Sequence, residues 1–230
     1  MSNIRSIING QEISEIELLR KELERAYIAL DLIKTKLGHE GVDRILKQEM
    51  DEMDVKFQHF ANTCDGELVL SQAVMQVDGL KAEDFLKCFR TFSEQTNWKA
   101  NPEHYMIKDT EGGNRRIIET VGCWDKPVNL IGKFYPNIEN APAQAKAIRD
   151  EAKYPYVNYI SCPVIEGDHS TAVAAFHQFR NTDTGCEVLL GVFMPKGVDQ
   201  EMIEGHKWHL AIEWRNWARM AMEQLAKEKA

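Results

Sequence analysis

The sequence of 230 residues predicts an α+β protein, in which a curved antiparallel sheet wraps around a long C-terminal helix and an N-terminal helical pair comes first. Three observations support this prediction. Apolar residues recur at three- and four-residue steps near both ends of the chain, as in amphipathic helices. Stretches rich in strand-forming residues, separated by turn signals, fill the region between them. A run of hairpin-linked strands with a long helix last is typical of an antiparallel sheet folded on a helix.

The first 63 residues are predicted to form the helical pair, as a unit separate from residues 64–230. Ser14 is a plausible N-cap for the first helix, and Gly38 is a plausible C-terminal stop. The second helix is expected from about Val42 to Ala61. The apolar faces of this pair, over residues 13–61, suggest a surface through which copies of the chain associate. The residues on these faces are Ile16, Leu19, Leu23, Ala26, Tyr27, Leu30 and Ile33, then Val42, Ile45, Leu46, Met50, Met53, Phe57 and Phe60.

The middle of the chain is predicted to begin with a strand in "ELVLSQAVMQV" and a helix in "KAEDFLKCFRTFSEQ". A hairpin follows, with "HYMIKD" and "RRIIETVGCW" as its strands and "TEGGN" as its turn, because glycine adopts positive φ freely. The segment "DKPVNLIGKFYPNIENAPAQ" is rich in proline and turn residues, which predicts a long loop. A short helix is expected around residues 143–153.

The last part of the chain is predicted to contain three strands and the long helix. The strands are "YVNYISCPVI", "TAVAAFHQFRN" and "CEVLLGVFMP", and the turn "TDTG" joins the last two. Asp199 is placed to cap the final helix, which is expected to run to about Lys227.

Composition narrows the function classes. The net charge of −8 and pI of about 5.4 disfavour a nucleic-acid partner, as does the acidic stretch "KQEMDEMD" in the second helix. No apolar run approaches the roughly 20 residues of a membrane helix, and the N-terminus lacks the apolar core of a signal peptide. Five cysteines without CxxC spacing, Cys64, Cys88, Cys123, Cys162 and Cys186, suit buried reduced thiols. We therefore expect a soluble, cytoplasmic protein.

The final helix carries a polar cluster on its apolar side. His206, His209 and Glu213 fall within an arc of roughly 60°, on the side that also presents Met202, Leu210, Trp217 and Met220. Polar groups facing a core are costly unless they are paired or bound. Because imidazole and carboxylate are ligands for zinc, iron or manganese, His209 and Glu213, four residues apart, are predicted metal ligands. His206 is a third ligand, an outer partner of the site or a proton shuttle. The alternative is a set of packed, hydrogen-bonded side chains.

One helix cannot complete a coordination shell, so the sheet must supply the rest. His104 and His177 are the histidine candidates, and Glu119 and Glu187 are the strand carboxylates considered. Period two places His177 on the strand face shared by Val173, Ala175 and Phe179. The remaining histidines, His39, His59 and His169, fall in a turn, a charged helix and a loop, so they are not expected ligands.

The C-terminal stretch "NTDTGCEVLLGVFMP" followed by "HLAIEWRNWA" resembles the diacetylphloroglucinol and phloretin hydrolases, a family with a START-like helix-grip fold. The resemblance implies zinc on His209 and Glu213, with Trp214 as the aromatic residue that follows, and hydrolysis of a carbon–carbon bond between an acyl group and a phenolic ring. The segment "GLKAEDFLKCFRTFSEQTNWKANPEHYMIKD" is similar to the family's helix that leads into a strand.

The chain also departs from this family. The family has a further histidine ligand in the upstream helix. Residues 83–98, which correspond to that helix, contain no histidine, and Cys88 is the ligand-type side chain found there instead. His104 or His177 then substitutes, or the site is altered or lost. The N-terminal helices are similar to those of 2-aminothiazoline-4-carboxylate hydrolase-like proteins, whose later cysteine-rich motif is absent here.

Together these features predict a zinc-dependent hydrolase acting on a small aromatic or acyl-phenolic substrate. His209, Glu213 and His104 are the expected metal ligands, and His206, His177 and Tyr105, with Tyr159 as an alternative proton donor, are the expected catalytic residues. A non-catalytic protein that binds a small apolar ligand is the alternative function. The side chains expected around the substrate are aromatic: Trp208, Trp214, Trp217 and Phe179, together with Phe176 and Phe193.

Overall fold

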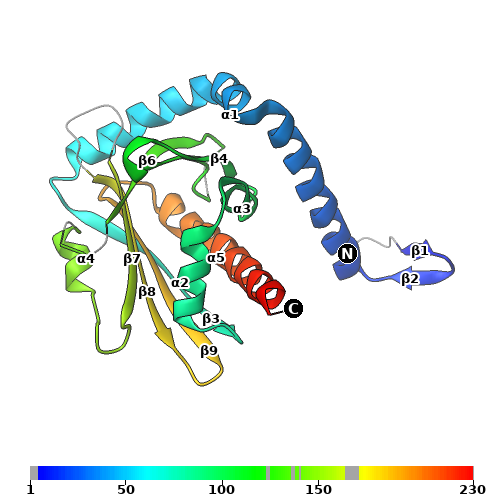
Figure 1. The fold of residues 1–230 in the computed structure, drawn as a ribbon. Coiled ribbons are helices and arrows are strands. Elements are labelled where there is room, and N and C mark those ends of the chain that lie inside the picture. The colour runs from blue at the N-terminus through cyan, green and yellow to red at the C-terminus, as the bar shows by residue number, and fades with distance from the viewer. Residues whose placement is uncertain (1–4, 123–124, 136–137, 140, 164–170, 230) are drawn as a thin grey trace. The chain divides into compact units, whose positions relative to one another are not determined.

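The computed structural model describes residues 5–122, 125–135, 138–139, 141–163 and 171–229 (Figure 1). Contacts divide the chain into two compact units, Met1–Val42 and Asp43–Ala230. The first unit contains a hairpin of β1 (Ser6–Ile8) and β2 (Gln11–Ile13) and the first part of helix α1 (Glu15–Thr63). The expected boundary after residue 63 lies inside the second unit.

Helix α1 is two helical segments separated at Gly38. Gly38 has φ 60° and ψ −176°, outside the helical region, so it interrupts the helix at the predicted stop. The segment after the break belongs mainly to the second unit. Its apolar residues Met53, Phe57 and Phe60 lie in the main core of that unit.

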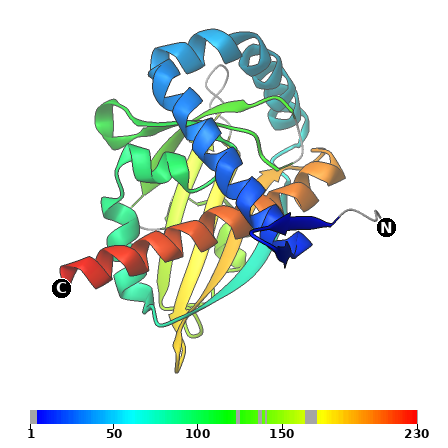
Figure 2. The ribbon, with the colours of Figure 1, turned by 90° about the vertical axis from the view of Figure 1, so that its right-hand side faces the viewer.

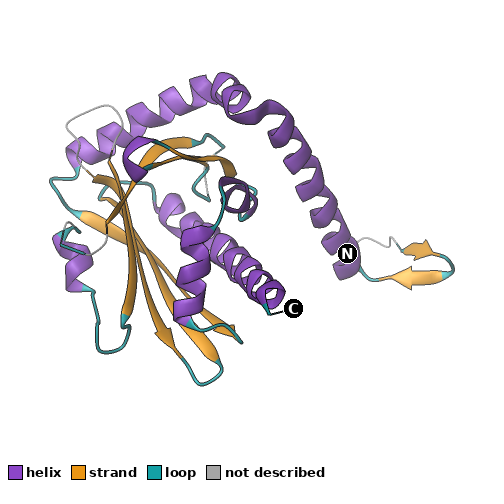
Figure 3. Cartoon of the chain, viewed as in Figure 1, coloured by secondary structure: helices purple, strands orange, loops and turns teal. Residues whose placement is uncertain are grey.

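The second unit is built on one antiparallel sheet of seven strands in the order β3-β9-β8-β7-β6-β5-β4 (Figure 3). Consecutive strands from β4 to β9 are neighbours, and β3 closes onto β9. The predicted α+β fold class is therefore confirmed. The strands are β3 (Leu68–Asp78), β4 (His104–Asp109), β5 (Arg115–Glu119), β6 (Val128–Tyr135), β7 (Tyr156–Pro163), β8 (Thr171–Asn181) and β9 (Gly185–Pro195).

The long C-terminal helix lies across the sheet (Figure 2), and apolar side chains from both form the main core. Helix α2 packs against this helix and against β8 and β9, and α3 packs against β4. The opposite face of β7, β8 and β9 carries a smaller cluster of Tyr159, Phe176 and Phe193 with Ala145 of α4. The helices of this unit beyond α1 are α2 (Ala82–Thr91), α3 (Glu94–Lys99), the 3₁₀ turn η1 (Glu111–Gly113), α4 (Ala143–Ala147) and α5 (Gln200–Glu228).

Two local expectations are wrong, and a third is met only in part. The predicted loop after residue 125 contains β6, in which Val128, Leu130 and Gly132 alternate inward and Leu130 pairs with Ile117 of β5. Helix α4 ends at Ala147, short of the expected residue 153. Asp199 is the N-cap residue of α5, as expected, but its side chain makes no capping hydrogen bond, and its Oδ2 pairs with Lys56 Nζ at 2.7 Å.

Cys64, Cys88 and Cys186 are buried free thiols. Burial raises the pKa of Cys186 to about 11 and also raises the pKa of Cys88, so these thiols are poor nucleophiles at neutral pH. Cys123, His169 and the side chain of Cys162 lie outside the described residues.

Among the helices of the described residues, none is both long and apolar enough to cross a membrane.

Candidate metal centre

Two pairs of side chains converge between the β4–β5 hairpin and α5. His209 and Glu213 stand one turn apart on the buried side of α5. His104 and Glu119 are direct partners in the register of β4 and β5, and directly opposed residues on adjacent strands place their side chains next to each other. His104 and His209 are both almost fully buried, at 1% and 2% exposure. The sheet therefore supplies candidate ligands beside the two on the helix.

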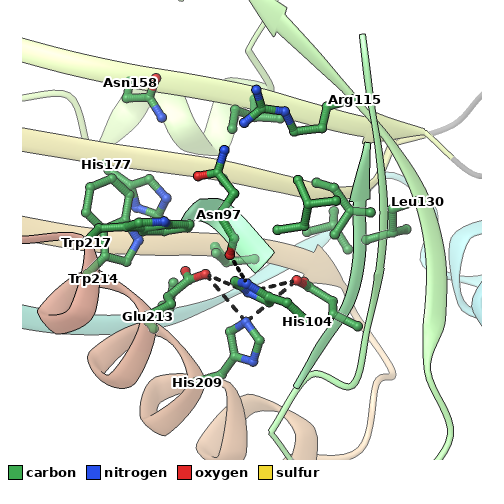
Figure 4. A pocket seen from close by; sticks show the side chains of 18 of the residues that line it. Asn97, His104, Arg115, Leu130, Asn158, His177, His209, Glu213, Trp214 and Trp217 are labelled. Atoms are coloured by element: carbon green, nitrogen blue, oxygen red, sulfur yellow. Dashed lines mark hydrogen bonds and ion pairs between the residues drawn. The ribbon is translucent and has the colours of Figure 1, made fainter. Parts of the chain in front are cut away.

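The four side chains meet through one atom each, as Figure 4 shows for those it labels. His104 Nε2 lies 3.2 Å from Glu213 Oε2 and 3.4 Å from Glu119 Oε2. His209 Nε2 lies 3.6 Å and 3.7 Å from the same two oxygens. The ligand atoms of His104, Glu119 and His209 all lie within 4.8 Å of one another, as in a group that could hold a metal ion.

These spacings fit a small metal ion. Ligands about 2.0–2.1 Å from a tetrahedral zinc are separated from one another by about 3.3–3.4 Å. The four nitrogen–oxygen distances, 3.2 to 3.7 Å, bracket this separation. The same distances equal or exceed the upper limit of the nitrogen–oxygen distance in ordinary hydrogen bonds, about 3.2 Å. The donor set of two imidazole nitrogens and two carboxylate oxygens also suits zinc, iron or manganese.

The other nitrogen of each imidazole is held by an oxygen. His104 Nδ1 lies 2.8 Å from the Asn97 carbonyl oxygen, to which it donates a hydrogen bond. His209 Nδ1 lies 2.5 Å from Glu103 Oε2. Each contact places the proton on Nδ1 and leaves the lone pair of Nε2 directed at the cluster. Outer partners of this kind orient metal-binding histidines and increase their basicity.

The loop before β4 holds Glu103 in place. Asn101 Oδ1 accepts the Glu103 backbone N–H at 3.1 Å, and Asn101 Nδ2 donates to the His209 carbonyl at 3.3 Å. Asn216 Nδ2 donates to the Ala100 carbonyl at 2.7 Å, a second tie between this loop and α5. The loop, the hairpin and the helix are therefore fixed to one another at the cluster.

The protonation equilibria show that the cluster favours positive charge. Burial lowers the pKa of His209, but Glu119, Glu103 and Glu213 outweigh burial and hold it well above its usual value. Burial raises the pKa of Glu213, while contacts with His104 and His209 bring it down to about 2. Burial dominates at Glu119 and raises its pKa. Three carboxylates around two imidazoles attract a cation, either a proton or a metal ion.

A cavity of about 100 Å³ adjoins the cluster, between the sheet and α5 (Figure 4). Trp214 and Trp217 line it from the helix, and Ile117, Leu130 and Val173 are among its apolar wall residues. Apolar side chains form most of the cavity surface, and polar side chains such as Asn97, Asn158 and His177 also line it, a combination typical of small-molecule sites.

His177 and His206 line this cavity without joining the four-residue cluster. His177 Nδ1 accepts the Gly191 backbone N–H at 3.3 Å, so its proton is on Nε2. Burial lowers the pKa of His177 to about 4, so the ring is neutral at physiological pH. His206 stacks on His209, with ring centroids 5.1 Å apart, and burial lowers its pKa to about 3.

Several expected site residues lie elsewhere. Trp208 is 74% exposed, because one helical step turns it away from His209. Phe179 is buried against Phe85 and Trp214, with centroid distances of 6.1 and 5.5 Å, and does not line the cavity. Tyr105 does not line it either.

The other expected site residues that lie away from the cavity are on the opposite face of the sheet or in a separate ion pair. Phe176, Phe193 and Tyr159 belong to the cluster on the sheet face away from α5. Glu187 binds Arg180, with contacts of 2.7 and 2.9 Å, and accepts the Tyr154 hydroxyl at 2.9 Å. It therefore does not contribute to the metal cluster.

No protein-family model matches this sequence, and no curated protein matches it significantly. The solved structures that match this chain include the following three. Ara h 8.0201 is 12% identical, with a TM-score of 0.46 over 68% of this chain and 99% of that chain. The protein MLL2253 from Mesorhizobium loti is 10% identical, with a TM-score of 0.39 over 69% of this chain and 98% of that chain. The protein XoxI from Bacillus cereus is 13% identical, with a TM-score of 0.38 over 68% and 97%. All three TM-scores lie below 0.5, so the fold class rests on the strand order and helix position above.

Proposed function

We propose that this chain is a metal-dependent hydrolase, with zinc as the metal, that acts on a small aromatic or acyl-phenolic substrate. The supporting observation is the convergence of His104, Glu119 and His209 at the spacing of metal ligands, with Glu213 Oε2 beside them at 3.2 Å from His104 Nε2 and 3.6 Å from His209 Nε2. The adjoining cavity, with its two tryptophans and aliphatic walls, suits a single aromatic ring.

The proposed reaction breaks the bond between an acyl carbon and a ring carbon. The hydroxyl of water joins the acyl carbon, the ring carbon receives a proton, and the products are a carboxylic acid and a phenol. A bound zinc ion supplies a Lewis acid that polarises the carbonyl or activates water. Asn97 and Glu103 hold the two ligand imidazoles in the correct tautomer. Of the proton donors expected from the sequence, Tyr105, Tyr159 and His177, His177 lines the cavity. Because its ring is neutral, His177 orients a substrate oxygen through its Nε2–H, and the proton that the ring carbon receives is the second proton of the attacking water.

The test begins with metal content. Protein purified without a histidine tag is analysed by mass spectrometry of its metals, beside the variants Glu213→Gln and His104→Asn. We expect near-stoichiometric zinc in the wild type and loss of zinc in both variants. Glu187→Gln is the matched control, because this glutamate is also buried but pairs with Arg180 away from the cluster. A resorcinol that carries the acetyl group on a ring carbon, 2,4-dihydroxyacetophenone, then serves as the trial substrate, with acetate and resorcinol quantified by chromatography.

Two results would overturn the proposal. The first is wild-type protein that binds no divalent metal after dialysis against each of zinc, iron and manganese. The second is full metal retention by folded Glu213→Gln and His104→Asn proteins. Metal-free protein whose melting temperature rises with small apolar ligands would instead favour the non-catalytic ligand-binding function.

A further inference from the structure

The two edge strands of the sheet differ in how they are protected from other chains. An edge strand presents unpaired backbone N–H and C=O groups, and natural proteins shield it by short length, lysine, proline or a bulge. β4 has six residues, contains Lys108, carries a bulge between His104 and Met106, and packs against α3. β3, at the opposite edge, has 11 residues without lysine, proline or a bulge along its pairing with β9 (Figure 1). A further strand can therefore add to β3.

Exposed apolar side chains gather beside this open edge. Four large hydrophobic side chains are exposed in the described residues after Thr63: Val74, Phe134, Trp208 and Met222. Three of the four belong to β3 or to α5, which packs on β3. Val74 is 60% exposed, and Trp208 is 74% exposed. Such a concentration of exposed apolar side chains is typical of an interaction surface.

Helix α5 runs along β3 in the same direction. Near the start of both elements, Ser71 Oγ donates to the Ile203 carbonyl at 2.8 Å. Near their ends, a Cβ at Gly79 would lie 3.7 Å from Met222 Cε. The side of α5 that looks toward the open edge therefore follows β3 over most of its length.

The exposed side of α5 carries a charged stripe, which consists of Glu201, Glu204, Trp208, Arg215 and Arg219. These five residues fall within an arc of roughly 60°, and all five are exposed. Both arginines line a groove between α5 and β3. Within the described residues, neither arginine is in an ion pair. The stripe is thus acidic at its N-terminal end, aromatic in the middle and basic at its C-terminal end.

This stripe is complementary to a second copy of itself that runs in the opposite direction. A two-fold axis at the middle of the stripe would set Glu201 opposite Arg219 of the second copy, and Glu204 close to Arg215 of that copy. Such an axis applies each contact twice, so one stripe supplies both sides of the interface. The charges also select the antiparallel orientation, because a parallel arrangement would set like charges together.

The edge of β3 has the same centre as the stripe. A helix rises about 1.5 Å per residue and a strand about 3.3 Å. Counted from the contact between Ser71 and Ile203, Leu210 in the middle of the stripe is level with Val74. A two-fold axis perpendicular to the sheet at Val74 would pair two β3 strands antiparallel and keep both α5 helices on one face. The strand edge and the charged stripe therefore agree on one arrangement.

We propose that β3 and the charged stripe of α5 bind a second copy of this chain, with the two β3 strands antiparallel about Val74. The sheets of the two copies then form one continuous sheet, and Trp208 of each copy packs against the α5 helix of the other. The interface lies on the side of α5 away from the buried His209 and Glu213, so it does not depend on the proposed hydrolase function. One strand edge and one helix stripe form a small interface with exposed ion pairs, so we expect association at concentrations well above micromolar.

Disulfide trapping tests the strand pairing. The full chain carries Leu19→Lys and Leu23→Lys, so that association through the exposed leucines of α1 does not contribute, and Val74→Cys is added. Mild oxidation should link two copies, because the two-fold axis sets residue 74 of one copy opposite residue 74 of the other. Val55→Cys is the matched control, since Val55 is a valine with 72% exposure that lies outside β3 and α5. We expect at least about tenfold more linked dimer from Val74→Cys.

Charge exchange tests the stripe on α5. Sedimentation equilibrium is measured on the same full chain with Leu19→Lys and Leu23→Lys and without the added cysteine. Arg215→Glu together with Arg219→Glu should weaken association at least about tenfold, because like charges then face each other. The further changes Glu201→Arg and Glu204→Arg should restore it, a recovery that a misfolded variant would not show.

Linking confined to Val74→Cys, together with recovery on charge exchange, would support the antiparallel pair. Three results would overturn it: a monomer at every concentration, equal linking of Val55→Cys and Val74→Cys, or no recovery on charge exchange. A monomer that instead binds an extended acidic peptide at this edge would also overturn it, because the edge would then serve a different protein.

Discussion

His104 of β4 and Glu119 of β5 are direct partners in the strand register, and their side chains are in contact. This pairing places both side chains beside His209 and Glu213 of α5. A slip of one residue in either strand would turn one of the two side chains to the other face. The bulge between His104 and Met106 lies at this point, where such irregularities commonly re-aim a side chain. The hairpin is therefore as much a part of the candidate metal site as the helix is.

The outer carboxylate should matter for metal affinity. Glu103→Gln keeps a hydrogen bond to His209 Nδ1 possible but removes the charge that increases the basicity of the ring. We expect zinc affinity to fall about 10- to 100-fold. Competition with a chromogenic chelator measures this change. Glu94→Gln is the control, because Glu94 is partly exposed and binds the same hairpin through the Asp109 backbone N–H, and an equal loss in both variants would contradict a specific role for Glu103.

Metal removal should lower thermal stability. The cluster gathers three carboxylates, those of Glu119 and Glu213 largely buried and that of Glu103 partly exposed, whose charges a divalent cation offsets. Zinc at a free concentration one hundred times its dissociation constant should stabilise the fold by about 2.7 kcal/mol. Scanning calorimetry with and without a chelator tests this. A melting temperature that is independent of zinc in the wild type would contradict the prediction.

The Arg180–Glu187 pair should make stability depend on pH in the acid range. The Arg180 hydrogen bonds, together with those from Gln76 and Tyr154, outweigh burial and hold the pKa of Glu187 at about 2. The unfolded carboxyl titrates near pH 4.3. The stabilisation is therefore complete above about pH 5 and is lost as the pH falls toward 2.

Urea unfolding of Glu187→Gln at several pH values checks this prediction. At pH 7 the variant should be less stable by about 1–3 kcal/mol. The difference from the wild type should shrink on acidification. A difference that stays constant from pH 7 to pH 2.5 would show that the pair acts by packing and not by charge.

Gly122 should not tolerate a side chain. A Cβ at this position would lie 2.2 Å from the Gly205 carbonyl oxygen of α5, and φ is +88°. We expect Gly122→Ala to lower the free energy of unfolding by about 2 kcal/mol or more. Gly113→Ala separates strain from contact, because Gly113 also has positive φ, at +75°, but has open space at its Cβ. Equal losses in the two variants, measured by urea unfolding, would mean that the close approach to α5 is not important.

The N-terminal helix should mediate self-association. Ile16, Leu19, Leu23 and Ile33 are exposed members of a strict three–four repeat that also includes Ala26, Leu30 and Leu37. In a parallel pair of such helices, Glu15 would face Arg20 of the second copy, a complementary contact. We propose that two copies pair along this seam.

Sedimentation of the full chain tests that pairing. Leu19→Lys with Leu23→Lys should convert a dimer into a monomer. Ile28→Lys should leave the dimer intact, because Ile28 is 53% exposed on another side of the helix. A wild-type monomer at micromolar concentration, or an unchanged mass in the double variant, would contradict this prediction.

The sequence predicted the elements whose pattern is local. The strands around His177, the helix bearing His209 and Glu213, and the break at Gly38 all follow from periodicity and glycine. The hairpin at residues 6–13 was signalled by Asn9-Gly10, both at positive φ, but was not predicted. Strand β6 was hidden by the prolines and turn residues on either side of it. The alternation of apolar residues within β6 favoured a strand less strongly than the flanking prolines and turn residues favoured a loop.

The site was only partly predictable, because it depends on tertiary register. His104 could be proposed as a ligand and Glu119 considered, but their pairing follows from how β4 and β5 align. Asn97 and Glu103 act on the site through a backbone carbonyl and an outer carboxylate, contacts that sequence spacing does not encode. Trp208 was expected at the cavity for its aromatic ring, although one helical step of about 100° already turns it away from His209.

The position of β3 has a consequence for synthesis of the chain. This strand precedes the whole meander in sequence yet pairs only with its last strand, and Gln76 bonds to Glu187, 111 residues later. At a translation rate of about 5–20 residues per second, β3 would leave the ribosome several seconds before its partner strand β9 is synthesised. During that interval an apolar edge is available to other nascent chains. Yield in the cell should therefore depend on translation speed and chaperone supply more than the stability of the finished fold alone would suggest.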